Sequence, residues 1–420
     1  MKTIDLELNV TRGTYLPAAL KLILNTDANL ENLIGSEFEE IYIHEFTHFI
    51  QDISTIYGLT NFILNLDDLA SRAQEIYKFH DGSKITRPVQ MELNSNTRIN
   101  RLLFKEYFGQ SLKKGDINSS SNWYITIEKK IIEGVISLNS IKVKVEEVEF
   151  KLGAFHMMES MAYEIQKFIY NSNSKSPEIP YCVVRNILKK NVKHNLDTLD
   201  IISICDASLL SFHPSEALYS LIIDLNKLES KPDLKWYYEY VEDGMNTAIE
   251  IDGQNNFKNI SDKVSEVIEY LNKIIPDPNL KDQKQWLINK LIKLKDKRLN
   301  ESDFLATILK SENPRLAFLE FIAEIGSPVI FNSNGFGFTI EKNEKIQDAS
   351  VYWSSIIEII RIFYGNSDCS LVEFCKNNLI EGKPNEYCNL SPWNRTTVFP
   401  HCYFAKFWKF WKFEKYDWNH

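Results

Sequence analysis

The sequence predicts an α+β fold that is mostly α, with a small antiparallel sheet and a large helical C-terminal part. Segments that alternate apolar and polar residues occur at the N-terminus and around 123–152, whereas apolar residues at helical spacing dominate much of the rest. A chain of 420 residues exceeds what one hydrophobic core usually supports. We therefore expect an α+β domain over 1–175, with an insertion at about 80–140, and a mostly helical domain over 176–420 that completes a cleft.

The elements expected in the first domain follow from these patterns. In chain order they are a strand over 1–10, helices over about 16–25 and 36–57, a polar stretch from His80, a helix over 97–108, a loop over 111–122, strands over 123–132 and 141–152, and a helix over about 154–171.

The second domain is expected to begin after a linker over 171–181. Helices broken by Pro and Gly should fill most of 182–310, and the segment 324–341 should form a loop with a short hairpin. The tail 403–418 interleaves nine aromatic residues with four lysines. We expect it to dock on the core, and a tail that binds a partner or a membrane surface is the alternative.

Composition narrows the class of protein. Hydrophobic residues make up 44% of the chain and charged residues 25%, which is typical of a globular protein. The net charge of −9 argues against a general nucleic-acid binder. The N-terminus has no apolar signal region, and no apolar run is long enough to cross a membrane. These features predict a soluble, cytoplasmic protein. Export by a route that needs no signal peptide is the alternative. The sequence predicts no oligomeric state.

The segment 39–52, EEIYIHEFTHFIQD, carries the strongest chemical signal. Ser36 and Glu39 match a capping box at the start of a helix, and Gly58 stands where the helix would end. In such a helix His44 and His48 lie one turn apart, about 40° around the axis, so both imidazoles can bind one ion. Glu45 lies on the adjoining side, where a carboxylate can take a proton from a metal-bound water.

The remainder of this helix is apolar, so the helix should be buried on most sides. Buried histidines need polar partners. A metal ion would supply one, and the alternative is two core histidines that bond to backbone carbonyl groups.

The stretch HEFTHFIQD resembles the zincin metallopeptidases, and locally the active-site helix of the thermolysin-like enzymes. The resemblance implies a zincin-like catalytic domain that holds one zinc ion per chain, with Glu45 as the general base. It also implies that Asp52 supports a ligand histidine, whereas an exposed helical Asp is the alternative reading. The pattern is confined to this helix and one further segment.

The third metal ligand is expected in the helix over 154–171. Glu159-x-x-Ala162 resembles the third-ligand helix of the gluzincins, although Tyr163 stands where many of those proteins carry Asp. Helical phase places Glu159 at the edge of an apolar face and Glu164 toward solvent. His156 is the alternative ligand. His156 and Tyr163 share the flank of Glu159, where either could stabilise an oxyanion or be a partly exposed helix residue.

Three further features are open to two readings. The segment 144–152 could be an edge strand that binds a substrate backbone, as zincins use. His213, with Asp206 or Glu216, could donate a proton during catalysis, or it could cap and pack a helix. Cys369, Cys375, Cys388 and Cys402, with nearby His401, could hold a structural zinc ion or be ordinary buried thiols.

The function expected from the sequence is therefore a zinc-dependent metallopeptidase of the gluzincin type. Zn²⁺ would be bound by His44, His48 and Glu159, and the partner would be a peptide or protein substrate. One alternative is a regulatory or binding protein with a non-catalytic zincin-like domain. The other is an interaction module that uses the aromatic tail.

Overall fold

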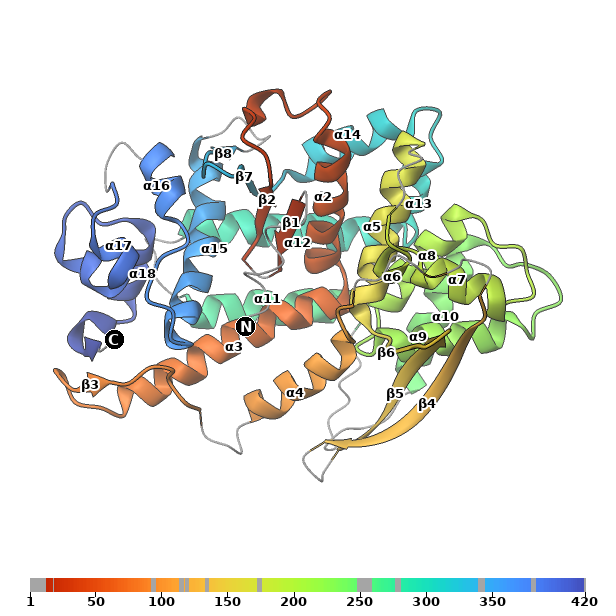
Figure 1. Ribbon diagram of the computed structural model, residues 1–420, viewed down its shortest axis with the longest axis horizontal. Coiled ribbons are helices and arrows are strands. Elements are labelled where there is room, and N and C mark those ends of the chain that lie inside the picture. Colours follow the sequence, from red (N-terminus) through yellow and green to blue (C-terminus); the bar gives the residue numbers. More distant parts are fainter. Residues whose placement is uncertain are drawn as a thin grey trace.

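The computed structural model has the α+β, mostly helical fold that the sequence predicts (Figure 1). In the described residues, strands form three small sheets, and helices make up most of the chain. The structure describes residues 13–17, 19–91, 96–112, 117, 121–132, 136–171, 176–247, 259–275, 281–338, 344–378 and 383–418. The strand expected over 1–10 lies outside these residues.

A four-stranded mixed sheet with the order β1-β2-β7-β8 lies near the centre of the molecule (Figure 1). β2 pairs antiparallel with β1 and parallel with β7, and β7 pairs antiparallel with β8. The strands are β1 (Gly13–Leu16), β2 (Lys21–Leu24), β7 (Val329–Phe331) and β8 (Gly337–Phe338). The hairpin expected within 324–341 is thus confirmed, and it joins strands from the opposite end of the chain.

The helix expected over 16–25 is wrong, because this segment turns and forms β2. Leu20 has a positive φ of 48°, which ends any helical run and starts the return strand. Leu22 and Leu24 are buried in the core. Pairing on both sides of β2, including with a strand some 300 residues away in sequence, outweighs the local helical pattern.

The single helix expected over 36–57 is instead two helices, α2 (Glu39–Ser54) and α3 (Ile56–Tyr77). Thr55 is extended between them, and its hydroxyl caps α3 by accepting a hydrogen bond from the N–H of Gly58. A side chain at Gly58 would come within 2.4 Å of the backbone of Asp52. Gly58 therefore permits the close turn between the helices, rather than ending α2 as expected.

Of the elements expected over 97–171, both helices and the strand over 123–132 are confirmed, whereas the single strand expected over 141–152 is instead parts of two strands joined by a turn at 146–147. The observed elements are α4 (Asn96–Phe108), the antiparallel sheet of β4 (Trp123–Ile132), β5 (Ile136–Val145) and β6 (Val148–Lys151), and α5 (Ala154–Tyr170). β4 and β5 form a long hairpin that projects from one end of the molecule (Figure 1). α5 begins immediately after β6 and packs against α2.

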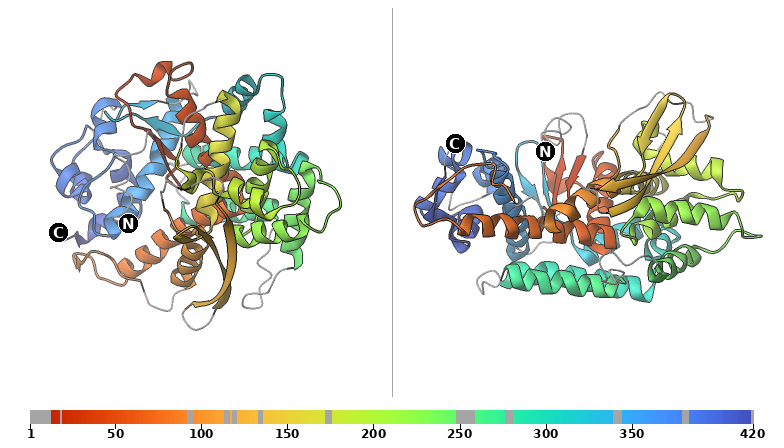
Figure 2. Two further views of the ribbon diagram at one scale, coloured as in Figure 1. Left: turned by 45° about the vertical axis from the view of Figure 1, so that its right-hand side comes forward. Right: turned by 90° about the horizontal axis from the view of Figure 1, so that it is seen from below.

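Helices fill most of the chain from 178 to 363, on both sides of α2 and α5 (Figure 2). They are α6 (Glu178–Tyr181), α7 (Val183–Asn191), α8 (Thr198–Leu209), α9 (Pro214–Leu225), α10 (Leu234–Thr247), α11 (Ile260–Ile274), α12 (Lys281–Asn300), α13 (Phe304–Leu309), α14 (Pro314–Ile325) and α15 (Glu344–Phe363). Across the described part of the chain, none of the helices has the length and apolar character needed to span a membrane. One cluster of buried apolar side chains includes residues on both sides of position 175, and the domain boundary there stays a prediction.

The C-terminal segments form a lobe of short elements beside α15 (Figure 1). They are α16 (Val372–Asn378), α17 (Tyr387–Leu390), the 3-10 helices η3 (Pro392–Thr397) and η4 (Phe413–Lys415), α18 (Tyr403–Phe410), and β9 (Asp417–Trp418), which pairs with β3 (Lys84–Ile85). Most of the aromatic rings of the tail are packed in the core, and Phe404, Phe407, Trp408, Phe413 and Trp418 are buried. The tail is therefore docked, as the first of its two readings expects.

Candidate metal centre

The two helices that the sequence analysis singles out face each other and bring three ligand side chains together. His44 and His48 lie one turn apart on α2, and Glu159 projects from α5. One ligand atom from each residue lies within 4.8 Å of the other two, and this is the one group of its kind among the described residues. The structure thus provides a His44–His48–Glu159 group that could hold a metal ion.

The spacing of these atoms fits a tetrahedral ion. Nε2 of His44 lies 3.4 Å from Oε2 of Glu159, and Nε2 of His48 lies 3.8 Å from Oε1 of the same carboxylate. Ligands at about 2.0–2.1 Å from a tetrahedral zinc ion lie about 3.3 Å apart. Small side-chain movements would bring all three donors to bonding distance. Both imidazoles are buried, and Glu159 is one-fifth exposed, so the group is open on the side of the carboxylate.

Two glutamines orient the imidazoles. Oε1 of Gln51 lies 2.8 Å from Nδ1 of His48, while Nε2 of Gln51 donates to the backbone oxygen of Met158. Gln166 repeats this arrangement, with Oε1 at 3.0 Å from Nδ1 of His44. Because each amide nitrogen has its own acceptor, each amide oxygen faces the histidine and requires a proton on Nδ1. The lone pair of each histidine is thereby left on Nε2, the atom that faces Glu159.

The amide of Gln166 ties the centre to a second carboxylate. Its Nε2 donates to Oε1 of Glu40 at 2.8 Å, which fixes the orientation of Gln166 across the α2–α5 interface. The sequence did not reveal either glutamine as a site residue, because an amide in a helix carries no distinctive pattern. Their role follows only from the packing of α2 on α5.

The nearby carboxylates act on the two imidazoles to different degrees. Burial lowers the pKa of both histidines, because a buried imidazolium ion loses its hydration. At His44 the bond with Glu159 and the charge of Glu45 outweigh burial and raise the pKa, whereas at His48 burial prevails and the pKa is lowered. A bound cation would satisfy Glu159 without a proton on either ring.

Glu45 is buried between α2 and β1, which is the end strand of the four-stranded sheet in the described part of the chain. A side chain at Gly13 would lie 2.8 Å from Oε1 of Glu45, so the absence of one leaves room for this carboxylate. The charge of Glu45 acts on both His44 and Tyr181. Glu45 therefore lies beside the metal-binding group and at the edge of the four-stranded sheet.

Tyr181 is a site residue that the sequence reading missed. It ends α6, within the segment expected to be a linker, and its ring lies edge-on to that of His44 with 5.8 Å between centroids. Burial first, and then the charges of Glu159 and Glu45, raise the pKa of Tyr181. Its hydroxyl therefore stays protonated and can donate a hydrogen bond. The ring of Tyr163 packs against that of Tyr181, with 5.6 Å between the centroids.

Asp52 lies on α2 and His156 lies on α5, and both are buried. Asp52 accepts a hydrogen bond of 2.9 Å from the hydroxyl of Tyr15, and the neighbouring Gln51 is the residue that holds His48. His156 lies in the first turn of α5, where its Nδ1 accepts a hydrogen bond from the backbone N–H of Gly153. Burial lowers the pKa of His156 to about 3, so its ring is neutral at ordinary pH.

His213 lies at the start of α9 and forms an ion-pair contact of 2.8 Å with Glu216. Its ring packs on Tyr107 at 4.3 Å between centroids. The structure therefore brings together His44, Glu45, His48 and Glu159 but does not place His213 in contact with them. Asp206, the other partner considered for His213, is paired with Arg298.

The position of Glu164 shows that the helical phase expected for α5 was wrong. The sequence analysis placed this carboxylate toward solvent, but it is fully buried and accepts a hydrogen bond of 2.6 Å from Nε of Arg185. α5 packs on α8 and α7 as well as α2, so the side that carries Glu164 is covered too. Helical phase alone does not place a polar residue in solvent when other helices cover several sides of a helix.

Comparison of the chain with protein-family models, curated proteins and solved structures gives no match. The inference of function therefore rests on the geometry of this centre.

Proposed function

We propose that the chain is a zinc-dependent hydrolase, and most specifically a metallopeptidase, with its active centre at His44, His48 and Glu159. The observation that carries the proposal is the combination of this ligand group with Glu45 on the same helix. A group that binds metal for structure alone has no use for a carboxylate beside the ligands. The two glutamines support the proposal because they leave both Nε2 atoms available as ligands.

A zinc ion bound here would supply Lewis-acid chemistry, lowering the pKa of water and polarising a carbonyl group. Glu45 would accept the proton of the attacking water on its carboxylate and pass it to the leaving amine nitrogen. Tyr181 would donate its hydroxyl proton in a hydrogen bond to the oxygen that gains charge. Both side chains lie next to His44, where these roles require them.

The proposed binding of a peptide substrate rests on β1. This strand stands at the end of the strand order β1-β2-β7-β8, and Gly13 places its backbone directly against Glu45. An extended peptide that pairs with β1 would have its backbone near the base. The segment 144–152, which the sequence analysis offered for this purpose, lies in β5 and β6 of the separate sheet of β4, β5 and β6.

The test compares Glu45→Gln with Glu37→Gln, an exposed carboxylate close in sequence. We expect Glu45→Gln to keep the metal at this centre and to lose about 10²–10⁴-fold in cleavage of a peptide library, because the general base is gone. Glu37→Gln should cleave like the wild type. His44→Ala and Glu159→Ala should each lose about one zinc ion per chain, since catalytic zinc needs three protein ligands.

Three outcomes would contradict the proposal. Full zinc retention in Glu159→Ala would remove this carboxylate from the ligand set. Absence of cleavage by the wild type, with zinc bound, would favour the regulatory or binding protein that the sequence also allows. Iron in place of zinc would also argue against a peptidase, because two histidines and one carboxylate form the ligand set of non-haem iron oxygenases as well.

A further inference from the structure

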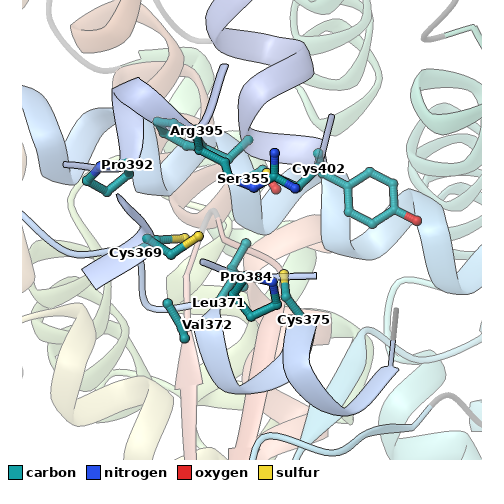
Figure 3. Close-up of a pocket in the computed structure, with 12 residues that line it drawn as sticks. Ser355, Cys369, Leu371, Val372, Cys375, Pro384, Pro392, Arg395 and Cys402 are labelled. Atoms are coloured by element: carbon teal, nitrogen blue, oxygen red, sulfur yellow. The ribbon is translucent and has the colours of Figure 1, made fainter. Parts of the chain in front are cut away.

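Four of the six cysteines line one pocket in the C-terminal lobe (Figure 3). Cys369 precedes α16, Cys375 lies within it, Cys388 is in α17, and Cys402 is the residue before α18. The backbone N–H of Cys369 donates to the oxygen of Cys388 at 2.9 Å, which joins two of these segments. The thiols therefore converge from four short segments, far along the chain from the His44–His48–Glu159 group.

The surroundings of two of the thiols act on their pKa in opposite directions. Burial, and then the charge of Glu358, raise the pKa of Cys369, while the nearby backbone N–H of Leu371 lowers it. Burial raises the pKa of Cys402, while the N–H groups of Ala405 and Phe404, in the first turn of α18, lower it. Nearby N–H groups of this kind stabilise a thiolate more than a thiol.

Two buried cations flank the thiols. Arg395 lines the pocket with a side chain that is only 2% exposed, and its Nη2 donates to the backbone oxygen of Pro400. Its Nε is buried and has no hydrogen-bond partner within the described ranges. Lys21 is also buried, with Nζ 4.6 Å from the ring centre of Phe331, and its charge interacts first with Glu358 and then with Cys369 and Cys375. An anionic occupant of the pocket would satisfy Arg395.

A small cluster of buried apolar side chains, separate from the main core, lies beside the cysteines. It consists of Val329, Phe331, Val351, Leu371 and Phe374, and Cys369 and Cys375 pack against it. The helices next to the cysteines are short. A metal ion would join these short segments to one another.

We propose that Cys369, Cys375, Cys388 and Cys402 bind a thiophilic metal ion as thiolates, with Arg395 and Lys21 offsetting the resulting charge. On binding of a divalent ion, four thiols release four protons to solvent and four sulfur–metal bonds form. The product carries a net charge of −2, which Arg395 and Lys21 offset in part. The pocket has a volume of about 20 Å³, which admits one ion.

The spacing of the sulfur atoms adds a distinct expectation. No three of them lie within 4.8 Å of one another, since the His44–His48–Glu159 group alone meets that limit in the described chain. Four sulfur atoms around one zinc ion lie about 3.8 Å apart, because each bond is about 2.3 Å long. The short segments must therefore draw together when an ion binds. An iron–sulfur cluster has the same thiolate chemistry and accepts more widely spaced cysteines.

The experiment uses the full chain carrying His44→Ala and Glu159→Ala, purified without oxygen, so that metal at the first centre does not contribute. We expect about one metal ion per chain and, after cobalt exchange, sulfur-to-cobalt charge-transfer absorption, as four thiolates require. Adding Cys375→Ser and Cys402→Ser should abolish both signals. Adding Cys205→Ala, at a buried cysteine in α8 outside the pocket, should preserve them.

Iron with acid-labile sulfide would also support the proposal and would identify a cluster as the occupant. Six freely titratable thiols in the unfolded wild type, with no metal bound to the folded protein, would overturn it, as would a disulfide between pocket cysteines. If the serine variant does not fold, the cobalt spectrum of the protein with all cysteines intact still tests the proposal, because it shows whether thiolates bind the metal. Because the first centre is removed, the result is independent of the proposed peptidase activity.

Discussion

The two candidate metal centres of this chain differ in how their polar groups are satisfied. At the His44–His48–Glu159 group, the second nitrogen of each imidazole is bonded to a glutamine that is itself anchored. In the cysteine pocket, Nε of Arg395 is buried without a partner among the residues described. The first centre lies on two long helices, whereas the second lies on short segments that meet at a small apolar cluster.

This difference indicates that the chain itself positions the first centre and that a ligand must complete the second. Both ends of α2 are held by arginines from the helical half. Arg315 forms two hydrogen bonds of 2.6 Å with Glu39 at the start of α2, and Arg298 donates to Ser54 at its end. Hydrogen exchange should therefore change little around α2 after metal removal and increase strongly around α16–α18. Equal increases in both regions would remove the distinction.

Among the changes that test how firmly α2 is held, Arg298→Met is expected to have the largest effect. Arg298 and Asp206 are both buried, with 2.7 Å between Nη2 and Oδ1, and Tyr238 also donates to Asp206. Loss of the arginine leaves Asp206 as an uncompensated buried charge and removes the bonds to Ser54. We expect the free energy of unfolding to fall by about 3–5 kcal/mol, measured by denaturant titration.

The matched control for this change is Arg298→Met combined with Asp206→Leu. It removes the stranded carboxylate, so much of the lost stability should return even though the bonds to Ser54 stay broken. A loss below about 1 kcal/mol in the single variant would show that the C-terminal end of α2 does not depend on this pair.

A smaller effect is expected from the two glutamines. Gln51→Ala and Gln166→Ala each remove the partner that keeps an imidazole in the right tautomer and orientation. We expect each change to weaken zinc affinity at the first centre by about 10–100-fold, measured by competition with a chelator. Gln110→Ala, at an exposed position outside the centre, should leave affinity unchanged. Unchanged affinity in both site variants would mean that helix packing alone orients the histidines.

The parts of the centre that sequence could predict are those with short-range patterns. Two histidines one turn apart require only a helix, and burial of that helix follows from its apolar residues. Glu159 was located by its motif and by its place at the edge of an apolar face. The structure brings these residues together as that reasoning requires.

The parts that sequence could not predict depend on contacts between distant segments. Lys21–Leu24 is a strand because β1 and β7 pair with it, and no pattern within 16–25 reports that pairing. Glu164 is buried because Arg185, on another helix, pairs with it. Tyr181 reaches His44 only because the supposed linker folds back against α5 as α6. Each case is a tertiary contact that outweighs local propensity.

The smallest predicted effect concerns the other end of α2 and its dependence on pH. Burial alone would raise the pKa of Glu39, but hydrogen bonds from Arg315, Tyr170 and the N–H of Gly35 outweigh burial and lower it. A carboxyl whose pKa is lower in the folded state stabilises the protein above its unfolded pKa. That stabilisation is lost as pH falls from the ordinary value of 4.5 through the folded pKa.

Glu39→Gln should therefore lower the free energy of unfolding by about 1 kcal/mol at neutral pH, a modest value because the Arg315 side chain is 43% exposed and screened by solvent. Denaturant titrations of the wild type and of Glu39→Gln, from neutral to acid pH, should show the difference in their free energies of unfolding disappearing below pH 4.5. Glu37→Gln, at the exposed neighbouring carboxylate, should show no such difference at any pH. A difference for Glu39→Gln that persists in acid would mean that shape and packing, rather than the charge of Glu39, hold the start of α2.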